Sequence, residues 1–257
     1  MEDKSFLAFS CVHAPLHDPE AIDWLVEQIA FRKPDLIVCL GDLHEMAWAS
    51  QHADVESIDA SVEYAASNEI LRQIRTACPD SRRVFLPGNH EARLDSPKID
   101  PRIRQAMHYR SHEPELRDHW EMPVPKYQMC RHSGCFRLGQ VAFHHGVACS
   151  ASGIKKEATI LAREWGLYIH GHTHRPTPEG QPEQIIAGQA WPLNFWRANP
   201  GCLRHMAPDW MAKEDKSRWG QGLISGRAQL LKSPRAKKCW DAESVHFRSY
   251  DEWRMVV

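Results

Sequence analysis

The sequence predicts an α/β fold in which helices cover a sheet of parallel strands. Two observations lead to this prediction: apolar runs alternate with helical patterns over the first ninety residues, and the apolar runs end in short polar clusters. Strands that alternate with helices are joined by crossover connections, which makes them parallel. The chain has 257 residues, of which 42% are hydrophobic and 25% are charged. A chain of this size can bury a core that is stable without disulfides.

The apolar pattern and the capping residues place the elements of the first half. Buried strands are expected at residues 6–12, 35–40 and 82–87. A helix is expected at 19–31, because Asp18 can cap its N-terminus and Pro19 suits its first position. A second helical pattern runs from about residue 54 to residue 77.

Residues 92–133 interrupt this alternation. They are rich in Arg, His, Pro and Glu and have weak periodicity. Two interpretations stay open: a partly helical insertion that forms a lid over a site, or a solvated connection. We therefore expect one domain over residues 1–257, with a lid-like insertion at about 92–133.

The sequence pattern in the second half of the chain predicts shorter strands. Residues 135–138 and 140–144 flank Gly139 like a hairpin, and a helical pattern follows at about 153–165. Further strands are expected at LYIH, which ends before Gly171, and near residues 184–187, 222–229 and 244–248. No internal repeat interrupts this order.

The composition of the chain limits which partners and which cellular compartment are expected. The formal net charge is −1 and the pI is about 7, so the overall charge predicts no long-range attraction to nucleic acid or to an anionic membrane. No apolar stretch approaches the roughly 18 residues of a membrane span, and no signal peptide is recognisable. The eight cysteines lack CxxC pairing and indicate reduced thiols. We expect a cytoplasmic protein without a membrane partner.

Histidine is the unusual residue type, with sixteen copies. Metal-capable side chains gather where each expected strand ends, in the clusters Cys11-Val12-His13, Gly41-Asp42-Leu43-His44-Glu45, Gly88-Asn89-His90-Glu91, His144-His145-Gly146 and Gly171-His172-Thr173-His174. Ligands of open α/β sheets bind outside the carboxyl ends of the strands. Alone, the first cluster can be a core thiol beside a surface histidine, and the second and third can be turns, whereas the two histidines of the last cluster are harder to dismiss. Together, in this order, they predict a metal site at one edge of the sheet.

The five clusters resemble the motifs of the calcineurin-like metallophosphoesterases, which are DxH, GDxx(D/E), GNH(D/E), HG and GHxH. The resemblance covers roughly residues 5–190. It implies a layered α/β/β/α sandwich with mixed sheets. It also implies a phosphoester hydrolase, acting on monoesters or diesters, in which two divalent transition-metal ions (Mn, Fe or Zn) share a bridging hydroxide. The stretches HAPLHD, GNHEARL, NPGCLRHMAPDW and WGQGL look closer to a phage-associated branch.

The resemblance also implies roles for individual residues. Asp42 would bridge both metals, and the other metal ligands would be Cys11, His13 and His174 at the first site and Asn89, His145 and His172 at the second. The catalytic histidine would be His90, which protonates the leaving oxygen or stabilises the phosphoryl group. Glu45 and Glu91 would orient imidazoles from behind. Arg93 and Arg175 would hold substrate phosphate, with a surface role as the alternative.

Cys11 departs from the family pattern, which has Asp at this position. A thiolate can ligate a metal and would favour zinc or iron over magnesium or calcium. The alternative is that Cys11 is not a ligand and that the first site is weakened. His144 next to His145 leaves a second ambiguity, and we choose His145 because it directly precedes Gly146.

Two other functions fit the same residues. One is a nuclease or nucleic-acid phosphatase of the same fold, with a nucleotide or nucleic acid as its phosphorylated substrate. The other is a non-catalytic binding module on a phosphoesterase scaffold that has lost catalysis, with Cys11 as the first sign. The fold alone does not choose among them.

Overall fold

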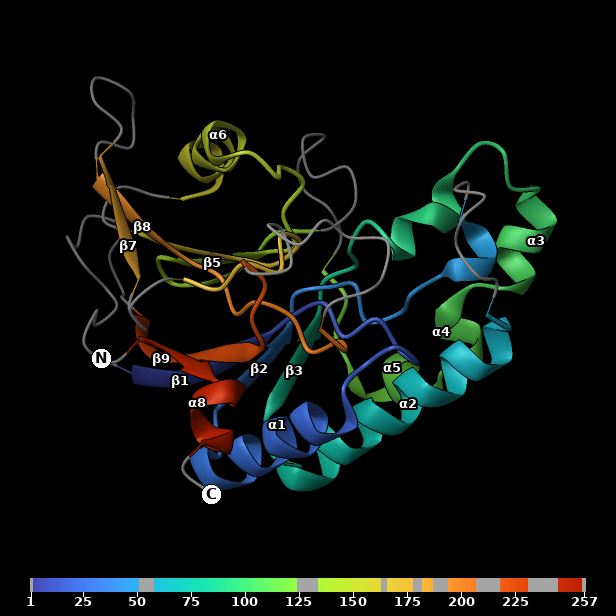
Figure 1. The fold of residues 1–257 in the computed structure, drawn as a ribbon, viewed down its shortest axis with the longest axis horizontal. Coiled ribbons are helices and arrows are strands. Elements are labelled where there is room, and N and C mark those ends of the chain that lie inside the picture. The colour runs from blue at the N-terminus through green and yellow to red at the C-terminus, as the bar shows by residue number, and fades with distance from the viewer. Residues whose placement is uncertain are drawn as a thin grey trace.

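Two five-stranded sheets pack face to face, and helices cover both outer faces (Figure 1). This computed structural model describes residues 2–50, 58–123, 134–162, 166–177, 182–186, 194–206, 218–230 and 245–255. Helices α1 and α2 cover one sheet, and α6 covers the other (Figure 1). The layered α/β/β/α architecture with mixed sheets is therefore confirmed.

The first sheet has the strand order β10-β9-β1-β2-β3. Its parallel centre is formed by β1 (Glu2–Phe9), β2 (Leu36–Cys39) and β3 (Arg82–Phe85). The antiparallel strands β9 (Gly222–Leu230) and β10 (His246–Ser249) extend it on the side of β1. Helices α1 (Pro19–Arg32) and α2 (Ala60–Ala77) make the crossovers between the parallel strands, as the alternating pattern predicts.

The second sheet has the order β4-β5-β6-β8-β7. Strands β5 (Val141–His144), β6 (Leu167–His170) and β8 (Asn194–Ala198) are parallel. The antiparallel strands β4 (Phe136–Leu138) and β7 (Glu183–Ile186) form its edges. Helix α6 (Ala151–Leu161) connects β5 to β6.

One apolar core lies between the two sheets. Phe6, Val38 and Val84 from the first sheet meet Phe143 and Ile169 from the second, and all five side chains are buried. A second apolar layer separates the first sheet from α1 and α2. The central strands are therefore buried on both faces, which explains why they read as continuous apolar runs in the sequence.

The segment after β3 is partly built into this second layer. It contains η2 (Glu91–Asp95), α3 (Pro101–Ala106), α4 (Tyr109–His112) and α5 (Pro114–His119). Tyr109, Leu116 and Trp120 are buried in the core with α2, whereas α3 has no buried residue. Residues 124–133 lie outside the described residues, so the lid stays a prediction.

Several element boundaries differ from the sequence prediction. Strand β1 begins at Glu2 and ends at Phe9 instead of covering residues 6–12, because the chain turns into the left-handed region at Cys11. Strand β8 and the short η1 helix (Ala47–Ala49) were not predicted. The start of the helix expected at 54–77 and the end of that expected at 153–165 fall partly outside the described residues. Among the described helices, none has both the length and the apolar character that a membrane span requires.

A candidate metal centre

The loops that follow β1, β2, β3, β5 and β6 meet at one edge of the two sheets. Backbone hydrogen bonds hold neighbouring loops together: the N–H of Cys11 donates to the carbonyl of Gly41 at 2.9 Å, and that of His13 donates to Asp42 at 2.9 Å. In the second sheet, Gly171 N–H donates to the carbonyl of His145 at 2.9 Å. The loops thus continue the pairing of the strands, and this brings the five sequence clusters together.

The backbone is strained where the candidate ligands lie. Five of the seven predicted metal ligands have positive φ angles, at Cys11 (55°), His13 (54°), Asp42 (51°), His172 (67°) and His174 (58°). Side chains other than glycine rarely adopt this region, at a cost of about 1–3 kcal/mol each. Strain of this kind concentrates at functional sites, where the surrounding structure holds an unfavourable conformation in place.

Two glycines allow the loops after β2 and β3 to approach each other. Gly41 has a φ of 104°, and a Cβ there would lie 2.5 Å from the carbonyl oxygen of Leu86. A Cβ on Gly88 would lie 2.2 Å from Oδ1 of Asp42. A side chain at either position would therefore push the two loops apart.

The first group of donor atoms contains Cys11, His13, Asp42 and His174, whose candidate ligand atoms all lie within 4.8 Å of one another. Nε2 of His13 lies 3.1 Å from Nε2 of His174 and 3.9 Å from Oδ2 of Asp42. Donors bound at about 2.0–2.3 Å to one ion lie within about 4.6 Å of one another. The spacing of this group is close to that limit, and its two measured distances, 3.1 and 3.9 Å, lie within it.

The second group contains Asp42, His145 and His172, and Asn89 joins it. Oδ2 of Asp42 lies 3.3 Å from Nε2 of His145. Oδ1 of Asn89 lies 2.9 Å from the same nitrogen and 2.7 Å from Nδ1 of His172. Asp42 thus belongs to both groups, and all seven predicted ligands come together.

Hydrogen bonds behind two of the imidazoles fix which nitrogen faces the centre. Nδ1 of His13 donates to Oε2 of Glu45 at 2.8 Å, and Nδ1 of His145 donates to the carbonyl oxygen of Leu40 at 2.8 Å. In the neutral ring the lone pair then lies on Nε2, which is the arrangement of a metal-binding histidine. Burial and the nearby His90 lower the pKa of His13, so its ring favours this neutral form.

Cys11 is a buried thiol in this arrangement. Its Sγ lies 3.0 Å from Oγ of Ser10. Burial, and then the negative charge of Asp42, raise its pKa well above the usual value. A cation next to the sulfur would reverse this preference, since a coordinating thiol loses its proton.

His145, and not its neighbour His144, faces Asp42. Nδ1 of His144 lies 3.2 Å from the hydroxyl of Tyr168 and accepts the N–H of Gly146 at 3.1 Å. Consecutive residues of a strand point to opposite faces, so only one of the two histidines can join the centre.

The predicted catalytic histidine lies against the first group. The ring centroids of His90 and His13 are 4.5 Å apart, and Oδ1 of Asp42 accepts the backbone N–H of His90 at 2.9 Å. Nδ1 of His90 donates to the carbonyl oxygen of Glu45 at 2.7 Å. Nη2 of Arg93 lies 3.3 Å from Nε2 of His90, and its Nη1 donates to the same carbonyl at 2.7 Å.

Arg175 takes a different place from Arg93. It lines a pocket together with Thr173 and Arg197, on the side of the loop after β6 where Cys149 contacts His172. The two arginines expected to bind substrate are therefore separated, one beside His90 and one in this pocket.

The sequence profile described as calcineurin-like phosphoesterase matches residues 4–176 of the chain. The chain belongs to the calcineurin-like phosphoesterase family. A comparison with curated protein sequences finds no match. Solved structures with low sequence identity have a similar fold. One of them is YfcE, a phosphoesterase from E. coli, with 13% sequence identity and a TM-score of 0.43. The match covers 93% of this chain and 98% of that chain.

Two other similar structures come from different organisms. One is a predicted phosphoesterase from Streptococcus pneumoniae TIGR4, with 13% identity, 98% of this chain and 92% of that chain covered, and a TM-score of 0.39. The other is Vps29 from Chaetomium thermophilum, with 12% identity, 96% and 97% of the two chains covered, and a TM-score of 0.41.

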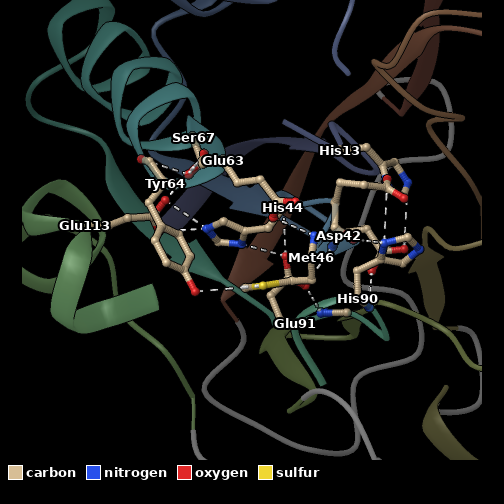
Figure 2. A network of polar contacts seen from close by, with 12 residues as sticks. His13, Asp42, His44, Met46, Glu63, Tyr64, Ser67, His90, Glu91 and Glu113 are labelled. Atoms are coloured by element: carbon tan, nitrogen blue, oxygen red, sulfur yellow. Dashed lines mark hydrogen bonds and ion pairs between the residues drawn. The ribbon is translucent and has the colours of Figure 1, made fainter. Parts of the chain in front are cut away.

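In this member of the family, a buried polar network supports the candidate metal centre from behind (Figure 2). Glu91 accepts four hydrogen bonds: Oε2 from the backbone N–H groups of Gly88 (2.6 Å) and Asp42 (3.0 Å), and Oε1 from the backbone N–H (3.0 Å) and Nδ1 (2.9 Å) of His44. Nε2 of His44 contacts Glu113 at 2.8 Å. Burial alone would lower the pKa of His44, but Glu113 and Glu91 raise it to about 10.

Part of this support was predicted from the sequence. Glu45 does orient the imidazole of His13. Glu91 orients His44 instead of a candidate ligand. His44 stood inside the second motif and could have been suspected, whereas no local signal marks Glu113, which follows α4 in the segment read as an insertion.

A second supporting residue, Asn199, lies behind the histidines of the last motif. This buried side chain donates from Nδ2 to the carbonyl of Gly171 at 3.0 Å and to Oγ1 of Thr173 at 3.1 Å. It thereby fixes the loop that carries His172 and His174. Asn199 follows β8, a strand that the sequence did not predict, so its role was missed as well.

Proposed function

We propose that the chain is a dinuclear metal-dependent phosphoester hydrolase. The observation that carries this proposal is the position of Asp42, whose carboxylate is shared by the two groups of donor atoms described above. A carboxylate between two groups of imidazoles is the arrangement that holds two cations a few ångströms apart. A single structural metal would need only one of the two groups.

The donor set suits divalent transition metals. Cys11, His13 and His174 would complete the first site, and Asn89, His145 and His172 the second, with Asp42 in both. Sulfur and imidazole nitrogen favour zinc or iron over calcium, and the oxygens of Asp42 and Asn89 also suit manganese. When bound, two such ions would activate a water molecule and neutralise charge on the phosphoryl oxygens.

The side chains around the centre would then act on the leaving group and the phosphoryl group. The carbonyl of Glu45 holds Nδ1 of His90 at 2.7 Å, which leaves Nε2 to exchange a proton with the leaving oxygen. Arg93, whose Nη2 is 3.3 Å from that nitrogen, would bind a non-bridging phosphoryl oxygen. Glu45 would keep His13 in the tautomer that presents Nε2.

Metal analysis together with turnover tests the proposal. We expect nearly two equivalents of manganese, iron or zinc per chain after supplementation. We also expect hydrolysis of bis(p-nitrophenyl) phosphate that Asp42→Asn abolishes. If no metal binds after supplementation, the chain is a binding module on a phosphoesterase scaffold. Salt-sensitive binding and cleavage of single-stranded nucleic acid would instead assign the nuclease alternative.

A further inference from the structure

A separate pocket adjoins the proposed metal centre. Its volume is about 330 Å³, and its lining includes Cys149, His170, Thr173, Arg175, Arg197 and Arg218. Pockets of about 300–1,000 Å³ hold small molecules or substantial parts of them. None of the seven candidate metal ligands lines this pocket, so it is a compartment of its own.

One contact joins the pocket to the centre. Sγ of Cys149, which lines the pocket, lies 3.2 Å from Nε2 of His172. Nδ1 on the other side of the same ring lies 2.7 Å from Oδ1 of Asn89 in the second donor group. The imidazole of His172 therefore borders both the pocket and the second donor group.

The pocket is strongly basic. Arg175 follows the last motif, Arg197 lies in β8 and Arg218 precedes β9, so three separate segments of the chain each contribute an arginine to the lining. No described residue that lines the pocket is an aspartate or a glutamate. Thr173 and Thr177 add hydroxyl groups to the wall. Guanidinium groups that converge with hydroxyls match the oxygens and the double charge of a phosphate group.

We propose that this pocket binds a second phosphate group of the substrate, which makes the substrate a phosphoester that carries another phosphate at a distance from the ester to be cleaved. This inference rests on the proposed function for the cleavage step. The anion-binding property of the pocket can be measured without turnover.

Binding of pyrophosphate to the purified full chain, measured by calorimetry at constant ionic strength, tests the pocket directly. We expect Arg197→Gln and Arg218→Gln each to weaken binding roughly tenfold, since each removes a charge-assisted contact. Arg218 is exposed, so its replacement leaves the fold intact. Arg72→Gln is the matched control, because Arg72 is an exposed arginine that pairs with Glu69 on α2. Asp42→Asn should retain this binding, which excludes bound metal as its source.

A matched pair of substrates tests the link to catalysis. The p-nitrophenyl ester of thymidine 5′-phosphate is compared with the same ester that also carries a 3′-phosphate. We expect Arg218→Gln to raise KM roughly tenfold for the phosphorylated ester only. Equal pyrophosphate affinity in wild type and both pocket variants, or equal KM effects on both esters, would overturn the proposal. Absent turnover with intact, arginine-dependent pyrophosphate binding would reject the hydrolase and keep the anion pocket.

Discussion

Oε2 of Glu91 lies 3.0 Å from the backbone nitrogen of Asp42, the residue shared by both groups of donor atoms. The same oxygen accepts the N–H of Gly88 at 2.6 Å. One buried carboxylate therefore ties the loop after β2 to the loop after β3. The position of Asp42 depends on a residue that is not itself one of the candidate ligands.

Glu91→Gln should destabilise the protein and weaken metal binding together. In either orientation the amide would turn its NH2 group towards two of the four N–H donors that Glu91 now accepts, and it would leave the buried imidazolium of His44 with one carboxylate fewer. We expect a loss of about 3 kcal/mol in the free energy of unfolding and roughly tenfold or greater loss of metal affinity. Urea unfolding and metal titration measure the two effects. Glu69→Gln serves as the control, because the side chain of Glu69 is exposed. An unchanged free energy of unfolding in the Glu91 variant would show that this network does not stabilise the fold.

The stability that His44 contributes should depend on pH. Its pKa is about 10 in the folded chain, against an ordinary value of 6.5. A raised pKa means that this stability is present in full below about pH 6.5 and is lost as the pH rises towards 10. We therefore expect His44→Gln to be most destabilising near pH 6 and progressively less so at pH 8 and 9.5. Unfolding curves measured at these three pH values would show the trend. A difference in unfolding free energy between wild type and variant that does not change with pH would argue against a charged His44.

Substitution of Cys11 should separate ligation from packing. Cys11→Ala removes the sulfur from the first donor group, and we expect it to lose one equivalent of metal. Cys11→Asp restores the residue that the family has at this position and should preserve or raise activity with manganese, because a carboxylate suits that ion. Metal content and turnover of an aryl phosphodiester measure both. Equal metal content and equal rate in Cys11→Ala and wild type would remove Cys11 from the ligands.

Gly88→Ala should displace Asp42 without removing any functional group. The added Cβ would lie 2.2 Å from Oδ1 and 2.6 Å from the backbone nitrogen of Asp42, so the carboxylate has to move. A misplacement of about 1 Å at a reacting centre can cost roughly 100-fold in rate. We expect a loss of that size in turnover, accompanied by reduced metal content. A variant with full metal content and wild-type turnover would show that the loop after β3 can move to accommodate the added Cβ without displacing Asp42.

The sequence predicted which residues would converge because the relevant signals are local. Each parallel strand is a short apolar run, and the chain must leave the sheet at its carboxyl end, so a polar cluster directly after the run has a predictable place. Asp42 and Asn89 follow β2 and β3 in this way. The strand ends were less predictable, since the left-handed turn at Cys11 gives no hydropathy signal.

The amino-acid sequence by itself determined the layered fold, the family and the set of residues that gather at the sheet edge, because periodicity and motif spacing are properties of neighbouring residues. Only the tertiary structure decided that Glu113 reaches His44 across 69 positions of sequence and that three arginines share one pocket. These relationships arise from the packing of segments that are distant in the chain. Local sequence carries no record of which side chains such packing brings into contact.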